Sequence, residues 1–264
     1  MRRREKGRVD MAESYPKAHD GKMIFTFTDF GLAGPYLGQV KAVLWQTAPD
    51  VPVFDLFADA PDRRPREAAY LLAAYAKALP HDALILGVVD PGVGGDRPGV
   101  ALKLDGRWLV GPGNGLFEIA QRRATRVESY GIAELPPDLS TSFHGRDLFA
   151  PLVGKLAAGW RPDEIGLEQG EQPRFPDWPD DLPVIVYQDI YGNLMTGLRS
   201  AGLPRTVRIG IGGRHVAWAR TFSAVEEGAA FWYGNANGLV EIAVNGGSAA
   251  VLLAAGIGSK LEII

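Results

Sequence analysis

Two aspartates stand where strands of an expected sheet end. Asp29 follows the apolar run 23–28, and Asp90 follows the apolar run 83–89. Ligands of open α/β sheets bind beyond the carboxyl ends of the strands. A carboxylate can accept paired hydrogen bonds from a vicinal diol such as that of a ribose. Asp29 is therefore a candidate ribose-binding residue, with a helix N-cap or turn as the alternative role.

A glycine-rich loop, DPGVGGDR, runs from Asp90 to Arg97. It lacks the glycine and lysine spacing of the common phosphate-binding loops. Its glycines allow a backbone to approach a ligand closely. The loop also places a carboxylate and a guanidinium at one sheet edge, with an ordinary surface turn and exposed ion pair as the alternative.

His144, in the sequence FHGRDLFAP, directly precedes an expected helix. Loops next to rigid elements often carry functional groups. An imidazole with a reference pKa of about 6.5 suits proton transfer near neutral pH, although a lone histidine is more often structural. No HExxH or comparable ligand spacing occurs in the sequence, so a metal site is the weaker interpretation. We expect neither a metal nor an organic cofactor.

A second group of polar residues lies near the C-terminal end. Asp189, Tyr191 and Asn193 form the sequence DIYGN after an expected strand, and Asn245 follows the run 239–244. An asparagine can pair with the edge of an adenine, and a tyrosine offers a stacking face. These residues are a candidate recognition set, with simple hairpin turns as the alternative.

Strand and helix patterns alternate in the first half of the chain. Apolar strands are expected at 23–28, 51–57 and 83–89, and helical periodicity connects them at 37–47 and 66–79. This alternation predicts an α/β domain with a largely parallel sheet over residues 23–169. Later features are a hairpin at Asp105-Gly106 and helices near 116–122 and from 146.

The composition changes after residue 169. Residues 170–182 are rich in proline and acids and are expected to form a linker. Residues 183–264 are expected to form a smaller all-β, barrel-like domain, because short strand patterns follow closely and no convincing helix pattern occurs. The expected strands are 184–188, 206–211, 215–220, 239–244, 249–254 and 260–264.

Bulk properties exclude several classes of protein. The 264 residues are 46% apolar and carry a net charge of −3, so no basic surface for nucleic acid is expected. The absence of cysteine excludes disulfides and thiol nucleophiles. No apolar run approaches the roughly 20 residues of a membrane helix. Residues 1–22 are expected to be a flexible tail without a secretory signal, with Met11 and Met23 as alternative starts, and the expected location is the cytoplasm.

The order of the motifs is more specific than any one of them. TDFG, DPGVGxxR, FHGRDxFAP, Dx[FY]GNxxT and LxEIAxNxGSAA follow one another from about Met23 to the C-terminus. In this order they resemble the S-adenosyl-L-methionine hydroxide adenosyltransferase family. These are S-adenosyl-L-methionine (SAM) hydrolases that form adenosine and are related to the fluorinating and chlorinating enzymes.

The resemblance implies an α/β domain, a β-barrel domain and a homotrimer with ligands bound between subunits. It implies that SAM and water give adenosine and L-methionine. The resemblance also implies a catalytic role for Asp90, Arg97 and His144. It implies that Asp29 binds the ribose and that Asp189 binds the methionine ammonium. Adenine contacts are implied for Tyr191, Asn193 and Asn245.

The chemistry fits these residues. A sulfonium is a good leaving group, so attack at the ribose C5′ mainly needs a positioned and partly deprotonated water. Arg97 can stabilise developing hydroxide, and either His144 or Asp90 can take the proton. The halogenating relatives carry Tyr at position 90 and Ser at position 145, whereas the carboxylate of Asp90 would repel a halide. A SAM-dependent halogenase-type transferase and a non-catalytic adenosine- or SAM-binding protein remain the alternatives.

The sequence also departs from the family pattern. The usual Thr-His after the second strand is Phe57-Ala58, and a usual aromatic residue is Arg63. Gly197 replaces a usual asparagine. Ala236-Asn237 stands where relatives use a serine to hold the methionine carboxylate, which affects the expected recognition of the methionine part more than that of the adenosine.

Overall fold

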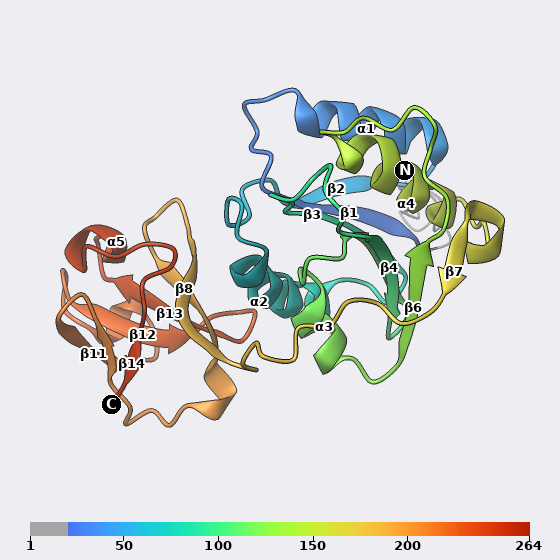
Figure 1. Cartoon of the computed structure of the whole chain (residues 1–264). Coiled ribbons are helices and arrows are strands. Elements are labelled where there is room, and N and C mark those ends of the chain that lie inside the picture. The colour runs from blue at the N-terminus through green and yellow to red at the C-terminus, as the bar shows by residue number, and fades with distance from the viewer. Residues whose placement is uncertain (1–20) are drawn as a thin grey trace, which may run out of the picture.

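The computed structural model describes residues 21–264, which form two domains joined by the segment 170–181 (Figure 1). The N-terminal domain is an α/β unit, and the C-terminal domain is built around one β-sheet. The expected tail 1–22 lies, apart from its last two residues, outside the described residues, as does Met11. Met23 is the first residue of strand β1.

The N-terminal domain contains a seven-stranded sheet in the order β2-β1-β3-β5-β4-β6-β7. Its strands are β1 (Met23–Thr28), β2 (Val53–Phe57), β3 (Ala83–Val88), β4 (Gly99–Leu104), β5 (Arg107–Pro112), β6 (Val127–Ile132) and β7 (Leu167–Gln169). The strands β2, β1, β3 and β5 are parallel, and the other three pair antiparallel. The predicted α/β architecture is confirmed, while β6 and β7 are additions that the sequence analysis did not include.

Helices cover both faces of this sheet (Figure 1). Helices α1 (Tyr36–Thr47) and α4 (Ala150–Ala157) pack against one face, and α2 (Pro65–Tyr75) and α3 (Glu118–Arg123) pack against the other. Every residue of β3 is buried for this reason, which explains its continuous apolar sequence. The helices on both faces of the sheet hold β1 and β3 side by side, with Thr28 opposite Val88.

The C-terminal domain contains a second seven-stranded sheet in the order β14-β10-β11-β12-β13-β9-β8. Its strands are β8 (Leu182–Gln188), β9 (Leu194–Arg199), β10 (Ile209–Ile211), β11 (Arg214–Trp218), β12 (Ala230–Gly234), β13 (Leu239–Val244) and β14 (Glu262–Ile263). Backbone bonds from Ile185 N to Ser259 O and from Leu261 N to Pro183 O, both 2.9 Å, join β8 to the segment before β14. The sheet is therefore a nearly closed barrel, as predicted.

One predicted strand of this domain is wrong. Residues 249–254 begin with a short helix, α5 (Ala249–Leu252), because Ser248 Oγ accepts a hydrogen bond from Val251 N at 3.3 Å and caps the turn. The expectation that this half contains no helix is wrong for the same reason. Strands β9 and β12 were not predicted. In β9, a Cβ at Gly197 would lie 2.7 Å from Leu182 Cβ, so the glycine lets β8 and β9 approach.

The two domains contact each other through aromatic side chains. The rings of Tyr75 and Tyr187 pack against Phe57 with centroid separations of 4.9 and 5.2 Å. The Tyr187 hydroxyl donates to Asp59 Oδ2 at 2.7 Å. These contacts dock β8 on α2, so the barrel is held next to the carboxyl-end loops of the N-terminal sheet by buried apolar area and a hydrogen bond.

Candidate active site

Asp29 and Asp90 lie beyond the carboxyl ends of the adjacent strands β1 and β3. Both line one cavity of about 90 Å³, which is large enough for a few water molecules. Phe30 and Phe143 form an aromatic wall, with ring centroids 5.7 Å apart. The complete lining is Asp29, Phe30, Arg63, Val88, Asp90, Val93, Ser142, Phe143, His144 and Gly145.

The glycine-rich loop packs against the segment that leads to His144. Gly94 has a positive φ of 80°, and a Cβ there would lie 2.2 Å from the carbonyl oxygen of Thr141. A side chain at position 94 would therefore push the two loops apart. The glycine brings Arg97 within reach of His144, which immediately precedes the π-helical turn Gly145–Phe149 and helix α4.

Arg97 joins the other two predicted catalytic residues. Its Nε donates to Asp90 Oδ1 at 2.9 Å, and its Nη2 donates to Asp90 Oδ2. The same Nη2 lies 3.0 Å from His144 Nδ1. The side chains of Arg97 and Asp90 are only 12% and 4% exposed, so this is a largely desolvated ion pair rather than a surface one.

The contact with Arg97 defines the tautomer of His144. A guanidinium can only donate hydrogen bonds, so His144 Nδ1 must be the acceptor and Nε2 must carry the proton. Burial lowers the pKa of His144, and the charge of Arg97 lowers it further, with Asp90 and Asp147 acting in the opposite direction. The imidazole is therefore neutral near pH 7 and presents an N–H group, while Asp90 is the adjoining acceptor.

Asp29 has a different environment. Its Oδ2 accepts a hydrogen bond from the backbone N–H of Arg63 at 2.9 Å. Burial raises the pKa of Asp29, the Arg63 hydrogen bond opposes that effect, and the charges of Asp62 and Asp90 add to it. The carboxylate lies at the cavity that contains Asp90 and His144, where a diol of a bound sugar can reach it.

Three residues of the candidate recognition set, Asp189, Tyr191 and Asn193, lie in the turn between β8 and β9. Asp189 Oδ1 accepts from the backbone N–H groups of Tyr191 and Asn193 at 2.9 and 2.8 Å, and Oδ2 accepts from Asn193 Nδ2 at 2.9 Å. Gly192 packs so closely on α5 that a Cβ would lie 2.0 Å from Ser248 Oγ. The turn is thus a rigid hairpin, and its side chains also border a cavity.

That cavity has a volume of about 650 Å³. Its lining contains two residues that the sequence analysis did not single out, Glu241 and Tyr233, whose side chains bond to each other at 2.5 Å. A charged residue inside the buried strand β13 was the available signal for Glu241, which is only 4% exposed. The complete lining is Asp189, Tyr191, Asn193, Phe222, Tyr233, Glu241, Val244, Gly246 and Gly247.

The side chain of Asn245 is hydrogen-bonded to the backbone of its own domain. Its Nδ2 donates to the carbonyl oxygen of Val225 at 2.9 Å, although its neighbours Val244 and Gly246 line the cavity. The predicted contact of its side chain with adenine stays a prediction. The N-terminal and C-terminal cavities share no lining residue, so a single chain brings the catalytic set together but does not join it to the recognition set.

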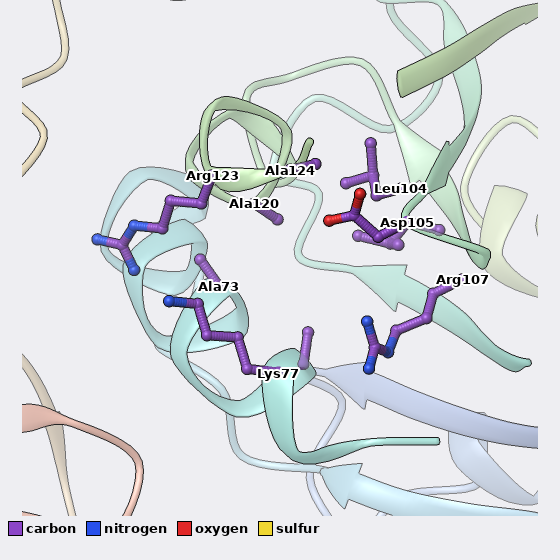
Figure 2. A pocket seen from close by; sticks show the side chains of 10 residues that line it. Ala73, Lys77, Leu104, Asp105, Arg107, Ala120, Arg123 and Ala124 are labelled. Carbon is purple, nitrogen blue, oxygen red and sulfur yellow. The ribbon is translucent and has the colours of Figure 1, made fainter. Parts of the chain in front are cut away.

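A further pocket lies between α2, α3 and the β4–β5 hairpin (Figure 2). Two of its charged groups, Asp105 and Arg107, are used in structural bonds. Asp105 accepts from the backbone N–H groups of Thr125 and Arg126, and Arg107 donates to the carbonyl oxygens of Leu79 and Pro80. None of the predicted site residues lines it, so it is not the candidate active site.

Residues 21–264 contain neither a membrane-spanning helix nor a metal-binding group of side chains. None of the helices there combines the length and the apolar character that crossing a bilayer requires. No group of three or more histidine, aspartate or glutamate side chains in that range has an arrangement that could hold a metal ion.

Comparison with known proteins identifies the family of the chain. Residues 24–166 match the family described as SAM hydroxide adenosyltransferase N-terminal domain, and residues 184–262 match the corresponding C-terminal domain. The two matches cover most of the chain, and the first includes Asp90, Arg97 and His144. The protein belongs to the SAM hydroxide adenosyltransferase family.

Individual relatives agree with this membership. The chain is 42% identical over 242 residues, 86% of its length and 93% of the relative's, to an (R)-S-adenosyl-L-methionine hydrolase of Thermus thermophilus. It is 34% identical over 252 residues, 89% of its length and 95% of the relative's, to a Salinispora arenicola protein of the same name. A crystal structure of an uncharacterized conserved protein from Thermotoga maritima superposes with a TM-score of 0.82 and 27% identity, covering 91% of this chain and 99% of the other.

The tautomer and the lowered pKa of His144 can be measured by NMR. In a ¹⁵N-labelled protein we expect the His144 ring to be protonated on Nε2 and to titrate below the reference pKa of about 6.5. Arg97→Gln should raise that pKa, because it removes the positive charge next to Nδ1. Exposed His215 is the internal control. An Nδ1-protonated ring, or a pKa unmoved by Arg97→Gln, would contradict the geometry.

Proposed function

We infer that the protein hydrolyses SAM to adenosine and L-methionine. The observation that carries this conclusion is the Asp90–Arg97–His144 contact beside the cavity that also contains Asp29. Relatives named (R)-S-adenosyl-L-methionine hydrolase support it. Because L already specifies the α-carbon, (R) in those names describes the sulfonium, and we propose that this protein also acts on the (R)-sulfonium epimer.

The residues can supply each part of the reaction. A water oxygen forms a bond to the ribose C5′ while the C5′–S bond breaks, and the sulfur leaves with the electron pair as the neutral thioether of methionine. Asp90 accepts the proton of the water, since Arg97 occupies the free lone pair of His144. The Nε2–H of His144 orients the water, and the charge of Arg97 stabilises the developing hydroxide.

The remaining predicted residues bind the substrate in this proposal. Asp29 accepts hydrogen bonds from the ribose hydroxyls, and Asp189 pairs with the methionine ammonium. Tyr191 and Asn193 contact the adenine. Asn245, which is bonded to Val225, holds the wall of the same cavity next to the adenine.

Product analysis tests the reaction. In H₂¹⁸O, the protein should convert (R)-SAM to methionine and adenosine labelled in the 5′-hydroxyl, because the water attacks carbon. The (S) epimer should react more slowly. Chloride or fluoride should not yield a halogenated nucleoside, since the Asp90 carboxylate repels an anion at that position.

Three results would contradict this proposal. Adenosine without ¹⁸O would exclude attack of water at C5′. A 5′-halogenated product would favour the transferase alternative. Binding of SAM without turnover of either epimer would favour a non-catalytic binding protein.

We also propose that the complete site forms between subunits of a homotrimer. The catalytic and recognition cavities have separate linings within one chain. Apolar side chains are exposed around the recognition hairpin, with Ile190 88%, Tyr191 72% and Val251 81% accessible. Exposed apolar patches of this kind mark interaction surfaces. In the proposed trimer, the N-terminal cavity of one subunit adjoins the C-terminal cavity of the next.

Complementation between variants tests the shared site. Asp90→Asn and Asp189→Asn alter different cavities, and each should be inactive or nearly so alone. When the two variants are unfolded and refolded together, mixed trimers should regain activity. Some of their interfaces then combine an unaltered catalytic cavity with an unaltered recognition cavity. No recovery from a mixture that light scattering shows to be trimeric would contradict a site shared between subunits, and a monomeric wild type would contradict the trimer.

A further inference from the structure

Arg63 has an unusual backbone conformation at the edge of the catalytic cavity. Its φ is +54°, in the left-handed region that side chains other than Gly, Asn and Asp rarely occupy. Such a conformation is strained and often occurs at functional sites. The hydrogen bond from Arg63 N to Asp29 Oδ2, at 2.9 Å, holds it there. The strained residue is therefore directly connected to the proposed ribose-binding carboxylate.

The guanidinium of Arg63 is available to a ligand. The side chain lines the cavity together with Asp90 and His144, and it is 76% exposed. Its partner in the structure is the adjacent residue Asp62, which accepts from Nε at 3.1 Å and from Nη2 at 3.0 Å. An exposed ion pair contributes little stability. The opposite edge of the guanidinium has no hydrogen bond to any of residues 21–264 and can receive a carboxylate.

The two cavities differ in charge, and the difference matches the charged groups of the substrate. Among the described residues, Arg63 is the one lysine or arginine that lines either cavity. The C-terminal cavity presents Asp189 and the buried Glu241, and both are acids. SAM carries a sulfonium, an ammonium and a carboxylate. The acidic cavity suits the cationic groups of the substrate and repels its carboxylate.

We propose that Arg63 binds the carboxylate of the methionine part of the substrate through a paired hydrogen-bonded contact. The inference rests on the proposed function and adds a specificity-determining residue to it. The hydrogen bond from Arg63 N to Asp29 Oδ2 connects the proposed ribose-binding carboxylate to the residue that carries this guanidinium. Arg63 does not contact the reacting atoms in this proposal, so its loss should weaken binding rather than chemistry.

A pair of ligands that differ only in the carboxylate tests this role. For Arg63→Gln, we expect the KM for SAM to rise at least about tenfold with little change in kcat, the effect of losing a charge-assisted contact. The inhibition constant of decarboxylated SAM, S-adenosyl-3-(methylthio)propylamine, should stay within about twofold of the wild-type value, because it has no group for Arg63 to bind. The matched control is Arg64→Gln, which changes an exposed arginine outside the cavity lining.

The outcomes separate this inference from the proposed function. An equal loss of affinity for both ligands would assign Arg63 a structural role, and unchanged kinetics would show that it does not bind the substrate. Either result overturns the inference while SAM hydrolysis by the wild type still stands. If the wild type does not hydrolyse SAM, the proposed function itself fails. Arg63→Lys should recover part of the affinity, because it keeps the charge but loses the planar fork.

Discussion

The contact of Arg97 with both Asp90 and His144 is the interaction on which the candidate site depends. One guanidinium satisfies a buried carboxylate and fixes the tautomer of a buried imidazole. Without Arg97, Asp90 would be an unpaired charge that is 4% exposed, a state that a protein tolerates poorly. Burial and the charge of Arg97 lower the pKa of His144, which is why the proposed mechanism uses Asp90 as the proton acceptor.

The fold supplies this contact through three separate segments. Asp90 follows a strand that is buried on both faces, Arg97 ends a glycine-rich loop, and His144 begins a helical segment. Gly94 allows the last two to meet, because a side chain there would collide with the backbone of Thr141. The barrel domain adds a second cavity with acidic and aromatic walls. In the proposed function, the two cavities together bind the sugar and the charged amino acid part of the substrate.

Much of this arrangement could be predicted from the sequence, because the signals were local. Strands β1 and β3 have continuous apolar sequences, and their ends locate Asp29 and Asp90 directly. The motif order identified the family. By contrast, residues 249–254 were predicted as a strand from their apolar run, but alanine and leucine favour helices, and the cap by Ser248 begins a helix there.

Tertiary contacts account for the other differences. Asn245 bonds to Val225, which is distant in sequence, and Glu241 belongs to the cavity because β13 pairs with β9 and β12. No sequence pattern indicates such partners. The positive φ of Arg63 likewise depends on Asp29, from another loop. Each of the two cavities lies within one domain, and hydrophobic periodicity does not predict how the domains pack against each other.

The most direct test of the central claim compares turnover with nucleoside binding in variants of the trio. For Asp90→Asn and His144→Ala, the account predicts that kcat for SAM falls at least about a hundredfold, while the dissociation constant of adenosine stays close to that of the wild type. His215→Ala, which alters an exposed histidine, should be unchanged in both. Wild-type turnover in either trio variant would show that the arrangement around Arg97 is not the catalytic one.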